Sequence, residues 1–283
     1  MIKRDVHADN ERVFSLLSAY LSHVPDLIDA DMMRSMTDEA HLPPATAYAL
    51  LLCSLCGLDA ADRGEGQYFY ENYFVPMVTE LDARAYKHDV YMKTVRFSES
   101  REGDWVLGHL SYRPYEAFPW NDPQTLPDGR VLPQIGFFPT AYRYPAVFQN
   151  DREWMSLVPN EVETMKAPIA AARGKVLTYG LGLGYFAFHA AEKAEVSAVT
   201  VVERDPDVID LFFGHILPQF PNREKITVVR DDAFHYAETV APGAHFDVSF
   251  TDLWHDPTDG IALYRRMKAL EALCPDTQHH LLD

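Results

Sequence analysis

The fold of this chain is decided at Lys175-Val176-Leu177-Thr178-Tyr179-Gly180-Leu181-Gly182-Leu183-Gly184. An apolar strand runs directly into a G-x-G-x-G turn, and helical spacing resumes from Tyr185 to Lys193. In this context a glycine-rich run indicates cofactor binding rather than a flexible loop. A dinucleotide pattern, G-x-G-x-x-G, would need a glycine where Tyr185 stands, which argues against a pyrophosphate ligand.

Strands and helices alternate beyond this turn. After the first strand at 175–179, the expected strands are 196–203, 226–230 and 246–252, with a short last one at 278–282, and the expected helices are 185–193, 207–217 and 261–274. Such alternation predicts a Rossmann-like α/β fold with a parallel sheet covered on both faces. Ligands of such sheets bind at the carboxyl ends of the strands, near the point where strand order reverses.

Two regions of different character precede this fold. Apolar positions at three- and four-residue spacing predict helices from residue 11 to about 85. Short β-rich runs follow from about Tyr86 to Phe148, with turns at 102–104 and 127–129. We therefore expect a helical unit at 1–85, a β-rich segment at 86–150 and a cofactor-binding domain at 151–283. This last domain opens with a helix that Asn160 caps, with Glu163 reaching back, and that Pro168 ends or kinks.

Composition restricts the partners. The 283 residues carry 25 basic and 42 acidic side chains, a formal net charge of −17, which repels phosphate backbones and anionic lipid. We expect a small-molecule substrate with an amine as one candidate, no nucleic acid and no membrane. Without an apolar leader the chain is expected to be cytoplasmic. The three cysteines form no disulfide framework, and the C-x-x-C at Cys53 and Cys56 is interpreted as buried thiols of a core helix.

Carboxylates end the next two strands. Glu203, nineteen residues beyond Gly184, can accept both ribose hydroxyl protons of an adenosine; the alternative is an exposed charge paired with Arg204. Asp232 follows the third strand and can accept from the adenine amino group. Asp231 is an equally good helix cap, so the roles of these two aspartates are divided by assumption.

Asp252 ends the fourth strand, where the reacting end of a cofactor held by the first turn would lie. It could hold a substrate amine or accept its proton, and Trp254 could shield a sulfonium or ammonium charge. Alternatively, Asp252 caps the following helix and Trp254 packs under the sheet. No H-x-H or H-E-x-x-H pattern supports a metal site.

From about Phe148 to Asp283 the chain resembles the class I S-adenosylmethionine-dependent methyltransferase superfamily, in the branch that contains spermidine synthase. The glycine turn, Asp232-Ala233 and the stretch from Asp247 to Pro257 carry the resemblance. Its most specific part is Val201-Val202-Glu203-Arg204-Asp205-Pro206-Asp207-Val208-Ile209.

The resemblance implies S-adenosylmethionine as the cofactor and Asp252 as the catalytic residue. The implied cofactor-binding residues are Gly180, Leu181, Gly182, Gly184, Glu203, Arg204, Asp232, Ala233 and Asp252. Glu161, Tyr185 and Trp254 could line the substrate side.

The chain also departs from the family pattern. Thr178 and Leu183 stand where many methyltransferases and the spermidine synthases, respectively, have acids, and the loop after the fourth strand is altered. The chain stops near the fifth strand, so the antiparallel last strands of the family are expected to be missing. Losing the acid at Leu183 removes a partner for an aminopropyl ammonium.

Methyl transfer to a small molecule or protein is therefore the leading interpretation. It needs mainly positioning, because the sulfonium is already a good leaving group. The alternatives are aminopropyl transfer from decarboxylated S-adenosylmethionine and a non-catalytic binding module. Hairpin edges between Tyr86 and Phe148 are candidate surfaces for a homodimer.

Overall fold

The computed structural model describes residues 4–253 and 257–282. Its contacts form two units: a first of Met1–Tyr86, Ser111–Arg143 and Val158–Glu163, and a second of Lys87–Leu110, Tyr144–Leu157 and Thr164–Asp283. The segment that the sequence separates as β-rich is therefore shared between the units. The boundaries near residues 85 and 150 stay predictions.

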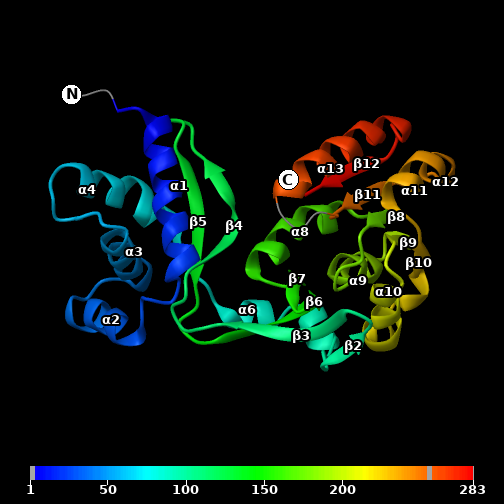
Figure 1. Ribbon diagram of the computed structural model, residues 1–283, viewed down its shortest axis with the longest axis horizontal. Coiled ribbons are helices and arrows are strands. Elements are labelled where there is room, and N and C mark those ends of the chain that lie inside the picture. The colour runs from blue at the N-terminus through cyan, green and yellow to red at the C-terminus, as the bar shows by residue number, and fades with distance from the viewer. Residues whose placement is uncertain (1–3, 254–256, 283) are drawn as a thin grey trace. The chain divides into compact units, whose positions relative to one another are not determined.

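The first unit packs helices on a small sheet (Figure 1). Its helices are α1 (Val6–His23), α2 (Ala30–Arg34), α3 (Pro44–Leu55), α4 (Glu65–Phe69), α5 (Val75–Met77) and α6 (Ala83–Lys87), with π-helical turns at Ser35–Glu39 and Tyr70–Phe74. The sheet has the order β1 (Val78–Glu80), β5 (Val131–Phe137), β4 (Phe118–Thr125). Asn10 of α1 accepts the Val131 N–H and donates to the Gly129 carbonyl, each at 3.0 Å, which fixes the helix to the predicted turn.

Cys53 is a packing group of α3, as predicted, whereas Cys56 follows the last residue of this helix and is half-buried. Cys53 is fully buried, and both Cys53 and Cys56 are free thiols. Burial raises the thiol pKa to about 11 for Cys53 and to about 12 for Cys56. The reactive thiolate is therefore disfavoured at neutral pH.

The second unit contains a five-stranded parallel sheet. Its order is β10 (Ile226–Arg230), β9 (Val196–Glu203), β8 (Gly174–Tyr179), β11 (Val248–Thr251), β12 (Gln278–Leu281). The accompanying helices are α9 (Tyr185–Glu192), α10 (Pro206–Leu211), α11 (Ala233–Thr239), α12 (Ala241–Ala244) and α13 (Pro257–Leu270), with π or 3-10 turns at Phe212–Ile216, Leu217–Gln219, Arg223–Lys225 and Glu271–Leu273. This is the predicted Rossmann-like alternation, with every predicted strand and helix present.

Alternating side chains of the strands pack into two hydrophobic cores, one on each face of the sheet. Leu177 and Tyr179 of β8 pack with residues of α11 and α13, which lie along one face of the sheet (Figure 1). Phe250 of β11 pairs with Thr178 on the other face, where Phe186 of α9 stacks on it at 4.3 Å between ring centroids. Both faces are covered, as near-continuous apolar strands require.

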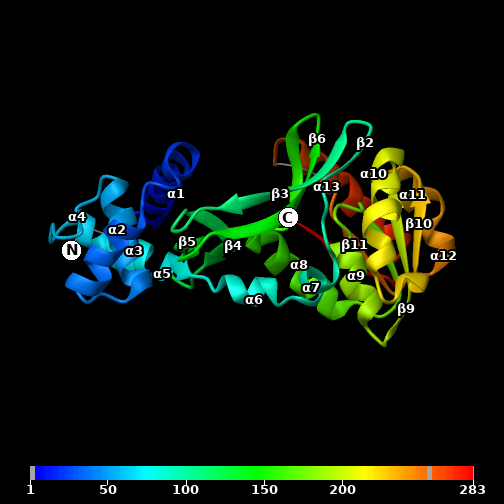
Figure 2. The ribbon, with the colours of Figure 1, turned by 90° about the horizontal axis from the view of Figure 1, so that it is seen from below.

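A second sheet belongs largely to the same unit. It has the order β2 (Ser100–Glu102), β3 (Trp105–Tyr112), β6 (Tyr142–Gln149), β7 (Arg152–Ser156), and β2 lies beside α10 (Figure 2). The β2–β3 hairpin turns at 103–104, as predicted. This sheet brings residues from the middle of the chain to the carboxyl end of β9.

Two sequence interpretations were wrong. Strands were expected from about Tyr86, but α6 continues to Lys87, and Asp89 then caps a further helix, α7 (Val90–Thr94), by accepting the N–H groups of Tyr91 and Met92. Asn160 is not a helix cap, since α8 (Pro159–Ala171) already includes it. Pro168 lies inside α8 without ending it, and its carbonyl accepts the Ala172 N–H at 3.1 Å.

No helix within residues 4–253 and 257–282 is long and apolar enough to cross a membrane. In the same two ranges, no three His, Cys, Asp or Glu side chains gather so that they could hold a metal ion.

Candidate functional site

The candidate site lies where the strand order reverses, between β8 and β11. The Asp252 N–H donates to the Tyr179 carbonyl at 3.1 Å, and the Gly180 N–H donates to the Val202 carbonyl at 3.0 Å. The glycine turn, Glu203, Asp232 and Asp252 therefore meet at one edge of the sheet. This is the edge at which ligands of parallel α/β sheets bind.

The glycines of the turn have left-handed backbone conformations that other residues rarely adopt. Their φ angles are +91° at Gly180, +49° at Gly182 and +75° at Gly184. A Cβ at Gly180 would lie 2.2 Å from the Asp252 carbonyl oxygen, and one at Gly184 would lie 2.6 Å from the Phe212 ring. The protein's own packing thus requires these glycines. The case for a ligand depends on where the turn lies and on the acids beside it.

Glu203 is bonded directly to the turn. Its Oε2 accepts the Leu181 N–H at 3.2 Å, and its Oε1 accepts the Asp205 N–H at 2.9 Å. A carboxylate offers about four acceptor positions, so capacity for two hydroxyl donors is left. Arg204 is exposed, and the salt bridges found among the described residues do not include a Glu203–Arg204 pair.

The two aspartates after β10 divide their roles differently from the sequence assumption. Oδ1 of Asp232 caps α11 by accepting the Phe234 and His235 N–H groups at 3.0 Å, while Asp231 bonds the His235 ring. Asp232 is exposed, and both capping bonds use the same oxygen. Its other oxygen remains an acceptor for a ligand amino group.

Asp252 is the acid with the most perturbed ionisation at this edge. Its side chain is half-buried after β11, and burial raises the pKa of its carboxyl to about 6. A carboxylate with such a pKa is ionised at pH 7 yet is a stronger base than an exposed aspartate. Asp252 can therefore accept a proton at neutral pH.

Residues of the second sheet cover the turn, and no sequence pattern indicated them. Met155 of β7 approaches Gly182 so closely that a Cβ there would lie 2.4 Å from its sulfur. The buried Trp105 of β3 donates its indole N–H to Asp205 Oδ2 at 3.0 Å, two residues beyond Glu203. Asp205 before Pro206 is a recognisable cap signal, but no local pattern reveals a partner 100 residues away.

The remaining predicted residues are placed as follows. Ala233 is buried at the start of α11. Tyr185 is buried in the first turn of α9, and its hydroxyl donates to Asp89 Oδ2 at 3.0 Å. Glu161 lies in the first turn of α8, in the part of the chain that belongs to the first unit, and Trp254 falls outside the described residues. The substrate roles of Glu161, Tyr185 and Trp254 stay predictions.

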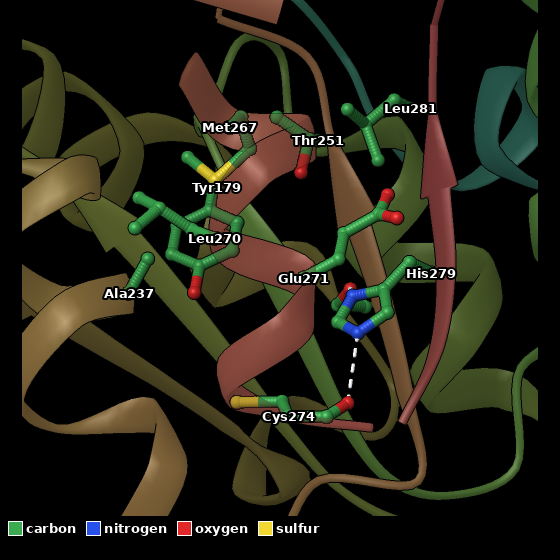
Figure 3. A pocket seen from close by; sticks show the side chains of 10 residues that line it. Tyr179, Ala237, Thr251, Met267, Leu270, Glu271, Cys274, His279 and Leu281 are labelled. Atoms are coloured by element: carbon green, nitrogen blue, oxygen red, sulfur yellow. Dashed lines mark hydrogen bonds between the residues drawn. The ribbon is translucent and has the colours of Figure 1, made fainter. Parts of the chain in front are cut away.

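A small cavity lies elsewhere, on the sheet face that α11 and α13 cover (Figure 3). Its volume of about 20 Å³ is room for about one water molecule. Tyr179, Thr251 and Glu271 contribute to its lining (Figure 3), and His279 bonds Ser249 at 2.7 Å and the Cys274 carbonyl at 3.0 Å. The cavity is too small for a nucleoside and is no cofactor site.

The second unit has a Rossmann-like fold, as the order of its parallel strands shows. Comparable solved structures include a spermidine synthase from Thermotoga maritima, 17% identical, with 48% of this chain and 50% of that chain covered and a TM-score of 0.35. A candidate spermidine synthase from Corynebacterium glutamicum is 18% identical, with 44% and 51% covered and a TM-score of 0.34. A candidate O-methyltransferase from Klebsiella pneumoniae is 19% identical, with 35% and 43% covered and a TM-score of 0.27.

The chain spans about half the length of the solved structures that it matches. No family model and no curated protein matches it. The fold assignment rests on the strand order, and no residue role is carried over from these structures.

Proposed function

We propose that the second unit binds S-adenosylmethionine at the carboxyl edge of its sheet and transfers the methyl group to a small molecule or a protein. The observation that carries this proposal is the meeting of the glycine turn, Glu203 and Asp252 at the switch point of the sheet. The acceptor groups suit an adenosine: Glu203 has acceptor capacity for the two ribose hydroxyls, and Asp232 has an oxygen outside its helix cap.

Bound there, S-adenosylmethionine would supply an activated methyl group on a sulfonium. The acceptor's nucleophilic atom would then form the new bond to the methyl carbon as the carbon–sulfur bond breaks, with its electron pair left on sulfur. Asp252 takes the proton that the acceptor loses, for which a pKa of about 6 is suited at neutral pH. The remaining task of the protein is alignment of the reacting atoms, which the fixed turn favours.

One observation favours a second candidate, aminopropyl transfer from decarboxylated S-adenosylmethionine. The half-buried carboxylate of Asp252 could pair with the ammonium of an amine, and two of the similar structures are spermidine synthases or candidates for that activity. Against it, Leu183 leaves the turn without an acid of its own. Methyl transfer therefore remains our first proposal.

Calorimetric titration separates the candidates. Tighter binding of S-adenosylmethionine than of its decarboxylated form supports methyl transfer, and the reverse order supports aminopropyl transfer. Binding of neither ligand contradicts both proposals and leaves a binding module.

The Glu203→Ala variant tests the ribose contact. Losing two charge-assisted hydrogen bonds should weaken cofactor binding by about a hundredfold. Glu224→Ala is the matched control, because Glu224 is an exposed acid of the same unit that precedes β10 at the opposite edge of the sheet. Equal affinities of the two variants would disprove the assigned role of Glu203.

A further inference from the structure

A short segment from the middle of the chain is hydrogen-bonded to the glycine turn. We define the α7 strap as residues 89–96, which contain α7 and belong to the second unit. The Tyr91 hydroxyl donates to the carbonyl of Leu183, inside the turn, and both groups are buried. This bond joins the strap to the turn across 92 positions of sequence.

Asp89 attaches the same segment to the helix that follows the turn. Its Oδ2 accepts the Tyr185 hydroxyl at 3.0 Å, and its Oδ1 lies 3.2 Å from Nε2 of His189. Burial pushes the pKa of Asp89 upward, but the hydrogen bonds and charge of His189 and the bond from Tyr185 outweigh it, so the pKa lies below its ordinary value. The ionised form of Asp89 is thus the one that this contact stabilises.

Aromatic contacts of Tyr91 and hydrogen bonds of Arg96 also attach the strap to the second unit. The Tyr91 ring meets the rings of Tyr185 and Phe188 edge-on, at 5.2 Å between centroids in each case. At the other end, Gln219 accepts the Arg96 N–H at 2.8 Å and donates to the Arg96 carbonyl at 3.0 Å. The strap is therefore held on both sides of the contact with Leu183.

We propose that Asp89 and Tyr91 are positioning residues that hold the glycine turn in the geometry needed for cofactor binding. The reason is local. The turn has three glycines at positive φ, and glycine loses more backbone conformational freedom on folding than any other residue type. Tyr91 restrains a carbonyl inside the turn, and Asp89 restrains the first turn of α9. The consequence for the cofactor rests on the proposed function, whereas the hold on the turn does not.

Two variants distinguish a positioning effect on the glycine turn from a general effect on stability. Tyr91→Phe keeps the ring contacts and removes the donor to Leu183. Asp89→Ser keeps a good cap for α7 but cannot reach both Tyr185 and His189. Asp89→Asn retains one acceptor oxygen and should lie between wild type and Asp89→Ser. Tyr236→Phe is the matched control, because it removes the hydroxyl of a buried tyrosine of α11 on the other side of the sheet.

Native-state hydrogen exchange is the readout that does not depend on the ligand. In Tyr91→Phe and Asp89→Ser, the amides of Leu181, Gly184 and Phe188 should exchange at least tenfold faster, while core amides of β9 keep their rates. Unchanged exchange at these three amides overturns the proposal, whether or not the protein binds a cofactor. Equal acceleration throughout the unit also overturns it, because the residues would then serve only general stability.

Calorimetry with S-adenosylmethionine supplies the second readout. If wild type binds it, the two strap variants should bind about tenfold more weakly, with Asp89→Asn between and Tyr236→Phe like wild type. Faster exchange with undiminished affinity overturns the positioning role. If wild type does not bind, the proposed function fails while the exchange result alone still decides whether the strap holds the turn.

Discussion

At the scale of single residues, the ionised carboxylate of Asp252 lowers the free energy of unfolding at neutral pH. Its pKa is about 6 in the folded protein against an ordinary 3.8, so the folded state binds a proton more tightly and becomes less stable as the pH rises from about 4 to 6. The shift of about two units corresponds to ~3 kcal/mol, which partial exposure reduces to about 1–2 kcal/mol.

The Asp252→Asn variant should therefore be more stable than wild type by about 1–2 kcal/mol at pH 7.5, with the difference vanishing below about pH 4. Urea denaturation at several pH values measures this. Asp276→Asn, which removes the charge of an exposed acid of the same unit, is the matched control. A destabilised Asp252→Asn at pH 7.5 would mean that the carboxylate makes a stabilising bond in the folded protein.

Under the proposed function, the same residue sets the expected pH dependence of methyl transfer. As a base, Asp252 must be ionised, so the single-turnover rate should rise tenfold per pH unit below about 6 and level off above it. Asp252→Asn should be slower by about 10²–10⁴ and lose this inflection. An unchanged profile in the variant would assign the inflection to the acceptor or to another group.

At the scale of elements, the glycine turn is constrained unequally along its length. A Cβ at Gly180 would meet the Asp252 backbone, one at Gly184 the ring of Phe212, and one at Gly182 only the flexible end of Met155. We expect Gly180→Ala to cost at least ~3 kcal/mol, Gly184→Ala about 2 and Gly182→Ala about 1 kcal/mol. Denaturant unfolding gives this order.

A double-mutant cycle isolates the Met155 contact. Met155→Ala removes the sulfur that faces Gly182, so Gly182→Ala should cost less in that background than in wild type. The φ of +49° at Gly182 remains in both backgrounds and sets a residual cost. Equal costs would show that backbone strain alone requires glycine at this position.

The sequence predicted these elements well where the signal is local. The strands from β8 to β12 and the helices α9, α10 and α13 follow from the apolar period and the glycine positions, which depend on neighbours only a few positions away. The strap was missed because Val90, Tyr91 and Val95 have β-like character, although Asp89 before them is a cap signal. The contacts of the strap with Leu183 and His189 join residues about 100 positions apart, which no local pattern reveals. Which of Asp231 and Asp232 caps α11 likewise depends on backbone geometry that the sequence does not show.

At the scale of the whole molecule, the second unit is discontinuous in sequence. Beyond residue 164 it contains the parallel sheet, but Asp89 and Tyr91 come from 87–110, as does Trp105, and Met155 comes from 144–157. A fragment of residues 151–283, the domain predicted from sequence, lacks the first three of these. It would expose Leu183, Tyr185 and Asp205 without their partners.

Two fragments test whether these segments are integral to the second unit. One is 151–283, and the other joins residues 87–110 to 144–283 through a short glycine–serine loop, which is feasible because β3 and β6 are neighbouring strands. The joined fragment should unfold in one cooperative transition, because it restores the buried contacts of Tyr91 and Trp105. The 151–283 fragment should melt broadly and bind a hydrophobic dye, as loosely packed states do. A sharp transition of 151–283 at the same temperature as the joined fragment would show that the parallel sheet folds without its strap, and would restore the boundary at residue 151.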